Sequence, residues 1–268
     1  MGELLSEVEE FIKKQPIYNR RRRLLMPIFR GVMNALYKVN VNGLANIPTD
    51  GPTLIISNHL SFFDPGISTA VIPDRYVISM SKAEAINNPV VRMVVALWGN
   101  YYIKRGEVDR RALLSTIELV KSGQLVWIAP EGTRNPSLQD PKDGVAYIAS
   151  KADATIVPMS IIGAGTLGEN LRRLRRAEVH VNIGIPFKFV SMGKRVTREM
   201  RALMMTEAMY RIAMTIPETY AHLRGSFGDL SQATFSTLQF INSPNNALSS
   251  INSEPTNQQK DDHANPVY

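Results

Sequence analysis

Two short segments carry side chains that could move a proton and hold an anion. The first, residues 58–65 (NHLSFFDP), contains His59 and, five residues later, Asp64. An imidazole titrates near neutral pH, so His59 could take a proton from an alcohol while a carboxylate orients its other ring nitrogen. The two would form the base and its orienting partner, as in a catalytic triad without a protein nucleophile. A structural histidine followed by a helix N-cap at Asp64 would use the same residues.

The second segment, residues 129–135 (APEGTRN), has groups suited to a phosphorylated substrate. Arg134 offers a planar fork that matches phosphate, Gly132 permits close approach of the backbone, and Glu131 could accept hydrogen bonds from hydroxyls. A structural turn with a surface salt bridge is the alternative interpretation.

Two further segments place unusual residues on predicted strands. Lys104 and Arg105 stand at a strand end and put two cations there. Val157 and Pro158 lie inside an apolar run. Because proline cannot donate to a β-ladder, we expect this strand at a sheet edge or in the wall of a cavity.

Short apolar runs alternate with helical patterns between residue 39 and about residue 227. The predicted strands are Thr53–Ser57, Tyr76–Met80, Tyr101–Lys104, Leu125–Ala129, Ile156–Ile162 and Val179–Ile185. The predicted helices are Val90–Trp98, Arg110–Lys121, Gly144–Lys151 and Thr197–Met214. This alternation predicts an α/β fold with an at least partly parallel sheet. The segment 129–135 follows a predicted strand directly, and open α/β sheets bind ligands at the carboxyl ends of their strands.

The N-terminal region combines a basic run with an apolar helical stripe. Proline is comfortable only in the first turn of a helix, so a helix is predicted from Pro27 to Lys38. The candidate membrane-binding residues are Arg20, Arg21, Arg22, Arg23, Leu24, Leu25, Ile28 and Phe29. The four consecutive arginines, Arg20–Arg23, form a basic collar beside this apolar stripe, and such an arrangement indicates an anchor on a membrane surface. A solvated charge run next to a core-packed helix is the alternative.

Composition limits the remaining classes of protein. The 268 residues carry a net charge of +7 and include no cysteine, which excludes disulfides, thiolate zinc sites and a cysteine nucleophile. No window approaches the ~18 apolar residues needed to cross a bilayer. Residues 229–268 are rich in Ser, Asn, Gln and Pro, which predicts a disordered tail. One lysine and four acids give this tail a charge of −3, so the first 228 residues carry +10.

Taken together and in this order, the four segments resemble the lysophosphatidic acid acyltransferase family, the PlsC-like glycerolipid acyltransferases. Residues 58–64 are similar to the family motif Asn-His-x-Ser-x-x-Asp. Residues 130–134 match Pro-Glu-Gly-Thr-Arg, with Ala129 where an aromatic residue is common. The strand that ends in Arg105 and the Val157–Pro158 block look like the two remaining motifs. The resemblance covers roughly residues 20–227.

The resemblance implies a mechanism and a fold. His59 would deprotonate the free hydroxyl of a lysophospholipid, Asp64 would orient it, and the alkoxide would attack the thioester of acyl-CoA or acyl-carrier protein without an acyl-enzyme. The implied substrate-binding residues are Lys104, Arg105, Glu131, Gly132, Thr133 and Arg134. Val157 and Pro158 would belong to the acyl site or to a structural motif. The family fold implies a mixed sheet flanked by helices, an apolar tunnel and an N-terminal membrane-binding element.

We therefore expect three parts: a membrane-associating helical segment (1–38), an acyltransferase domain (39–228) and a disordered tail (229–268). The expected reaction acylates 1-acyl-sn-glycerol 3-phosphate to phosphatidic acid in phospholipid biosynthesis. The expected partners are an anionic membrane surface at the cytoplasmic face, a lysophospholipid and the acyl donor, with no nucleic acid, metal or cofactor. One alternative keeps the chemistry on another lyso-lipid. The other is a non-catalytic basic protein that binds anionic lipid or nucleic acid.

Overall fold

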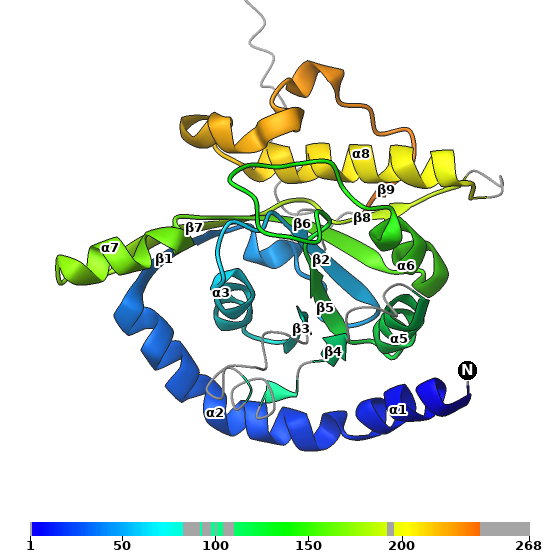
Figure 1. Cartoon of the computed structure of the whole chain (residues 1–268), viewed down its shortest axis with the longest axis horizontal. Coiled ribbons are helices and arrows are strands. Elements are labelled where there is room, and N and C mark those ends of the chain that lie inside the picture. Colours follow the sequence, from blue (N-terminus) through cyan, green and yellow to red (C-terminus); the bar gives the residue numbers. More distant parts are fainter. Residues whose placement is uncertain are drawn as a thin grey trace, which may run out of the picture.

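A mixed β-sheet forms the centre of the domain (Figure 1). The computed structural model describes residues 2–82, 92, 98–99, 101–103, 110–191 and 196–241. In these ranges the strand order is β1-β7-β6-β2-β5-β3-β4, and β8 and β9 continue the sheet beside β6. The strands are β1 (Tyr37–Asn42), β2 (Thr53–Ser57), β3 (Val77–Lys82), β4 (Tyr101–Ile103), β5 (Leu125–Ile128), β6 (Thr155–Ile162), β7 (Ala177–Ile183), β8 (Phe187–Phe189) and β9 (Leu238–Phe240).

The middle of the sheet is parallel. β2 pairs in parallel with β5 on one side and with β6 on the other, and β5 pairs in parallel with β3. β6 pairs antiparallel with both β7 and β8, which makes the sheet mixed as the resemblance implied. The carboxyl ends of β2 and β5 therefore meet at one edge of the sheet.

Helices cover both faces of the sheet (Figure 1). Strand residues alternate between two cores, as their period of two requires. Ile55 packs in the core shared with α2 and α3, whereas Leu54 and Ile56 pack in the core shared with α5, α6 and α8. The helices are α1 (Gly2–Lys13), α2 (Gln15–Leu36), α3 (Asp64–Val71), α5 (Arg110–Lys121), α6 (Gly144–Ala152), α7 (Leu167–Arg172) and α8 (Arg198–Thr215), with short 3-10 helices η1 (Leu44–Asn46), η3 (Ala164–Thr166), η4 (Glu218–Phe227) and η5 (Leu230–Gln232).

Most predicted elements in the described ranges are confirmed. The strand Thr53–Ser57 and the helix Arg110–Lys121 have the predicted bounds, and the other strands and the last two helices shift by only a few residues. The predicted helix Val90–Trp98 falls outside the described residues except for Arg92 and Trp98. In the part of the chain that the structure describes, no helix is both long enough and apolar enough to cross a membrane.

The N-terminal helix differs from its prediction. α2 begins at Gln15 and contains Pro27 in its interior, while Tyr37 and Lys38 belong to β1. An interior proline costs about 3 kcal/mol because it removes one helical hydrogen bond. Burial of Met26 and Met33 against the domain offsets this cost. The prediction that Pro27 stands in the first turn of the helix is wrong because the packing of α2 against the domain outweighs the low helix propensity of proline.

The segment 229–241, expected to be disordered, is ordered in the structure. Glu207 on α8 is buried, and its two carboxylate oxygens accept hydrogen bonds from the backbone and hydroxyl groups of residues 234–237. β9 then pairs antiparallel with β8. Polar residues of the segment that was expected to be disordered instead supply the donors for a buried carboxylate. Residues 242–268 lie outside the described residues.

Pro158 does not mark a sheet edge. β6 lies between β2 and β7, and Ile56 of β2 is the register partner of Pro158. The Pro158 carbonyl accepts a hydrogen bond from Gly184 N at 2.8 Å, in the break between β7 and β8. N–H and C=O of one strand residue point to the same side, so the missing donor faces this break. A central strand tolerates the proline there because no ladder partner is required.

Candidate active site

His59 lies just beyond the end of β2, and the residue before it fixes its position. The residue before it, Asn58, is buried and pairs with the backbone of Ile161 on β6. Its Oδ1 accepts from Ile161 N at 2.8 Å and its Nδ2 donates to Ile161 O at 2.9 Å. Asn58 therefore extends the β2–β6 pairing by one residue and fixes where the chain turns away.

Asp64 holds the backbone turn and the imidazole together. Its Oδ2 lies 3.1 Å from His59 Nδ1 and also accepts from Leu60 N at 2.9 Å and Ser61 N at 2.7 Å. Asp64 is fully buried and is the first residue of α3, where the helix dipole favours negative charge. The N-cap position belongs to Phe63, and Asp64 bonds residues before the helix, so the N-cap interpretation of Asp64 is wrong.

Within the described residues, no hydrogen bond engages the second nitrogen of His59, Nε2. With Nδ1 directed at a carboxylate, the neutral ring carries its hydrogen on Nδ1 and a lone pair on Nε2. The side chain is 19% exposed, so a small group can reach it. The Trp127 ring from β5 packs edge-on at a centroid distance of 5.3 Å and limits rotation of the imidazole.

The segment 129–135 lies directly beside this histidine. β5 runs parallel to β2 with Ile56 opposite Ile128, so the loops that follow them emerge side by side. Asn135 N donates to His59 O at 3.0 Å and joins the two loops. The parallel pairing of β2 and β5 thus brings the two segments together at one edge of the sheet.

Glu131 is buried beside the base. Its Oε2 accepts from Asn135 Nδ2 at 2.7 Å, and its Oε1 accepts from Gln139 N at 3.4 Å. Burial raises the pKa of Glu131, although these hydrogen bonds and the charge of His59 act in the opposite direction. Glu131 thus shapes the loop, with one oxygen committed to Asn135, and does not stand open to solvent.

Gly132 and the exposed residues around it form the mouth of the site. Gly132 has a φ of 72°, and a Cβ there would lie 3.1 Å from Lys142 Nζ and 3.2 Å from Lys142 Cε. Thr133 and Arg134 are exposed to solvent. Lys142 is a site candidate that the sequence analysis missed, because nothing in the sequence shows that residue 142 folds back over residue 132.

The other predicted site residues are Lys104, Arg105, Val157 and Pro158. Lys104 and Arg105 are outside the described residues; the strand before them, β4, pairs with β3 at the end of the sheet path. Val157 is fully buried opposite Ile55 in the core that α2 and α3 cover. Among the described residues, no group of three or more His, Cys, Asp or Glu side chains is placed to hold a metal ion.

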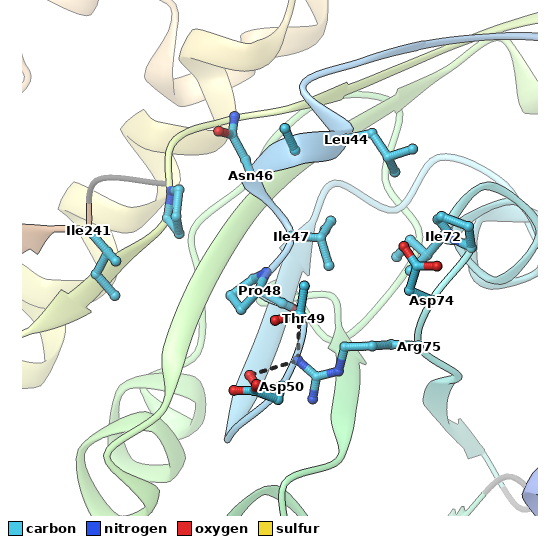
Figure 2. Close-up of a pocket in the computed structure, with 13 residues that line it drawn as sticks. Leu44, Asn46, Ile47, Pro48, Thr49, Asp50, Ile72, Asp74, Arg75 and Ile241 are labelled. Carbon is cyan, nitrogen blue, oxygen red and sulfur yellow. Dashed lines mark hydrogen bonds between the residues drawn. The ribbon is translucent and has the colours of Figure 1, made fainter. Parts of the chain in front are cut away.

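Figure 2 shows a pocket of about 440 Å³ lined in part by the residues that precede β2. His59 follows the other end of this strand. The walls of the pocket come from residues 44–50, residues 72–75, Pro186 and Ile241, and none of the predicted site residues lines it. Arg75 does not present its guanidinium to a ligand there. Its Nη1 and Nη2 donate to the carbonyls of Pro48, Asp50, Gly51 and Gly123. The pocket is therefore separate from the His59–Asp64 pair.

The candidate membrane-binding residues divide between two faces of α2. Leu24 and Ile28 are 72% and 68% exposed. Arg20, Arg21 and Arg23 are exposed as well. Arg22 is fully buried and points into the domain, so it does not belong to the collar. Phe29 turns inward to pack against Trp98 at a centroid distance of 5.3 Å, and Leu25 is half-buried. Successive residues of a helix turn by 100°, so a run of neighbours cannot share one face.

The fold and this site define an α/β protein with a buried-carboxylate–histidine pair at the carboxyl edge of its sheet. Such a pair can activate a hydroxyl group, and the exposed cations nearby can hold an anionic one. Residues 38–162 match the family model Acyltransferase, and this range contains all four of the sequence motifs.

Relatives and a solved structure agree with the family model. The chloroplast 1-acyl-sn-glycerol-3-phosphate acyltransferase of Arabidopsis thaliana is 33% identical over 138 residues, which cover 49% of this chain and 38% of the relative. The 1-acyl-sn-glycerol-3-phosphate acyltransferase of Borreliella burgdorferi is 28% identical over 128 residues, or 46% and 51% of the two chains. The matched region thus spans about half or less of these relatives.

The crystal structure of the 1-acyl-sn-glycerophosphate acyltransferase PlsC from Thermotoga maritima superposes with a TM-score of 0.55. It is 20% identical in sequence, and the match covers 87% of this chain and 89% of that one, which shows a common fold. The family model, the relatives and the common fold together support the resemblance to the PlsC-like acyltransferase family that the four motifs indicated.

Proposed function

We propose that this protein transfers an acyl chain from acyl-CoA or acyl-carrier protein to the free hydroxyl of 1-acyl-sn-glycerol 3-phosphate, giving phosphatidic acid for phospholipid synthesis. The observation that carries the proposal is the His59–Asp64 pair, with Nδ1 held at 3.1 Å and Nε2 free at a partly exposed edge. Relatives named 1-acyl-sn-glycerol-3-phosphate acyltransferase support the choice of acceptor.

In the proposed reaction, Nε2 of His59 takes the hydroxyl proton while the acceptor oxygen attacks the thioester carbonyl. The buried Asp64 stabilises the imidazolium that forms. The tetrahedral intermediate then expels the thiolate, which takes the proton back from Nε2, so that the products are an ester and a free thiol. The step needs only the two substrates and no covalent acyl-enzyme, in agreement with a sequence that lacks cysteine.

Arg134 is proposed to bind the acceptor phosphate. It is exposed at the mouth of the site, in the loop that contacts His59. Replacement by alanine removes a charge-assisted hydrogen bond worth about 1.5–3 kcal/mol, so KM for the phosphorylated acceptor should rise roughly 10- to 100-fold. KM for the acyl donor should change much less. Steady-state kinetics with each substrate varied in turn measures both, and Arg173→Ala, exposed at the C-cap of α7, is the control. Equal effects on both substrates would contradict this role.

Lys104 and Arg105 are proposed as further ligands of the glycerol phosphate, on the strength of the family motif alone. Val157 and Pro158 are proposed to support the wall near the acyl chain from within the core. Glu131, Gly132 and Thr133 complete the loop that carries Arg134.

The protein is proposed to lie on the cytoplasmic face of a membrane through the exposed face of α2. Leu24 and Ile28 would enter the interface, and the exposed arginines would meet anionic lipid headgroups. Exposed apolar side chains of this size next to basic ones are typical of helices that lie in the interfacial plane.

The triple change Arg20→Gln, Arg21→Gln and Arg23→Gln should weaken binding to anionic vesicles. Each basic residue near such a surface contributes about 1 kcal/mol, so the loss should approach 100-fold. Vesicle co-sedimentation at low and high salt measures it. The pair Leu24→Ser and Ile28→Ser should weaken binding to neutral and anionic vesicles alike. Unchanged binding in both variants would remove the membrane role of α2.

Mass spectrometry tests the proposed substrates most directly. Purified protein is offered a mixture of lysophospholipids with acyl-CoA or acyl-carrier protein, and the lipids formed are identified. Phosphatidic acid as the main product supports the proposal. Preference for another lyso-lipid would replace the acceptor and keep the chemistry. Binding of anionic lipid without any product would indicate a non-catalytic protein.

A further inference from the structure

α3, the helix that begins with the catalytic carboxylate, is held between the sheet and α2. In Figure 1, α2 passes along the side of α3 that faces away from the sheet. On the sheet side, Ile67 is fully buried, and Ser68 Oγ approaches Met159 Sδ of β6 at 3.7 Å. On the other side, a Cβ at Gly66 would lie 3.7 Å from the Phe29 ring of α2, which is ordinary contact distance.

Arg30 of α2 binds the carboxyl end of α3. Its Nε donates to Ala70 O at 3.0 Å and its Nη2 donates to Ile72 O at 2.9 Å. The last carbonyls of a helix have no partner within the helix, and a cation there also complements the helix dipole. The planar fork of the guanidinium presents two N–H donors on separate nitrogens to the two carbonyls, a geometry that the single nitrogen of an ammonium group does not match. Arg30 thus joins α2 and α3 through two hydrogen bonds.

Contacts from the end of α2 also reach the amino end of α3. Tyr37, the first residue after α2, packs its ring edge-on against Phe63 at a centroid distance of 6.1 Å. Phe63 directly precedes Asp64. Burial, and then the charge of Asp64, raise the pKa of Tyr37 to about 12, so Tyr37 stays neutral beside the carboxylate. α2 and the residue after it therefore contact α3 at both of its ends.

We infer that Arg30 is a positioning residue for acyl transfer: by fixing α3 to α2, it keeps Asp64 in place against His59. This inference rests on the proposed function. α3 has eight residues and is about 12 Å long, so it moves as one short rod. A shift at its carboxyl end is passed to Asp64 at its amino end, whose Oδ2 holds both the imidazole and the turn. The N-terminal region that carries the basic run thus also contains an arginine, Arg30, that acts on the proposed general base His59.

The test compares Arg30→Gln with the wild-type protein on lipid vesicles, at a temperature where circular dichroism shows both fully folded. Misplacement of a catalytic group by about 1 Å can cost 100-fold, so kcat should fall by at least about 10-fold. KM for acceptor and donor and the affinity for vesicles should stay the same, because the Arg30 guanidinium is bound to the carbonyls of Ala70 and Ile72. Arg30→Lys should recover part of kcat by binding one of the two carbonyls.

Arg176→Gln is the matched control. Arg176 also donates from a guanidinium to a backbone carbonyl of α2, Asn34 O at 3.1 Å, and within the described residues no hydrogen bond or ion pair joins it to α3. This variant should keep the wild-type kcat. Hydrogen exchange adds a readout that does not need turnover: in Arg30→Gln, amides from residue 60 to residue 68 should exchange faster, as well as those at the carboxyl end of α3.

Two results would overturn the inference. One is a kcat for Arg30→Gln that stays at the wild-type value, whether or not KM rises. The other is faster exchange confined to residues 69–72, which would make Arg30 a helix cap and nothing more. A wild-type protein that prefers another acceptor would contradict the proposed function only, since kcat can then be compared on that acceptor. A wild-type protein without activity leaves the exchange experiment to decide.

Discussion

Replacement of His59 by alanine is expected to lower kcat for acyl transfer by about 10²- to 10⁴-fold, the usual contribution of a general base. The loss should fall on the chemical step, because Nε2 acts only in the proton transfers of the proposed reaction. Vesicle binding should not change, since the residues proposed to face the membrane lie on α2. Lipid product formed per second under saturating substrates measures kcat, and co-sedimentation measures binding.

His222→Ala is the control for this experiment. His222 is an exposed histidine in η4, so its removal should leave both measurements at wild-type values. Asp64→Asn extends the test to the orienting group. An amide at this position cannot accept from His59 Nδ1, Leu60 N and Ser61 N as a carboxylate does, so kcat should fall here too. If His59→Ala kept more than a tenth of the activity, His59 would not be the base.

The pairing of His59 with the loop 129–135 could be predicted because it depends on short-range rules. β2 and β5 are apolar runs that end where polar residues begin, and parallel neighbours bring their carboxyl ends together. The spacing of five residues between His59 and Asp64 fits one turn of chain before a helix. Local sequence was sufficient wherever one strand and the residues directly after it determined the geometry.

Features that depend on distant contacts could not be predicted in this way. Lys142 approaches Gly132 only because the loop after residue 135 returns across the site. The ordered segment 234–237 depends on Glu207, which lies about thirty residues earlier and reads in the sequence as an ordinary helical acid. The start of α2 was misplaced because a proline rule was applied to a helix whose stability comes from tertiary packing.

The burial of Arg22 is a further feature that could not be predicted from the sequence. In the sequence this residue is one of four consecutive arginines, yet the structure buries it completely. Its Nε donates to Trp98 O at 2.7 Å and its Nη2 to Gly99 O at 3.0 Å. Its Nη1 bonds the side chains of Gln15 and Asn19, and its guanidinium lies against the rings of Tyr18 and Tyr76. Burial lowers the pKa of Arg22 to about 10.

Through these contacts Arg22 links α2 to the turn at Trp98 and Gly99, before β4. Gly99 in this turn has a φ of 71°, and a Cβ there would lie 2.6 Å from the Tyr18 ring, so the two surfaces are in direct contact. Every hydrogen bond found for Arg22 within the described residues ends on a neutral oxygen. Its removal therefore leaves buried acceptors without donors, each at a cost of about 1–3 kcal/mol.

We expect Arg22→Met to lower the free energy of unfolding by about 3 kcal/mol or more, because methionine fills the space but donates nothing. Arg22→Lys should be nearly as destabilising, since one ammonium cannot reach carbonyls and side-chain oxygens in several directions. Arg23→Met, on the exposed side of the same helix, should change the free energy by less than about 0.5 kcal/mol. Urea unfolding followed by tryptophan fluorescence measures all three. A loss below 1 kcal/mol for Arg22→Met, together with weaker vesicle binding, would show that Arg22 belongs with the arginines proposed to face the membrane. A large loss with unchanged vesicle binding per folded molecule would show that Arg22 stabilises the fold, unlike Arg20, Arg21 and Arg23.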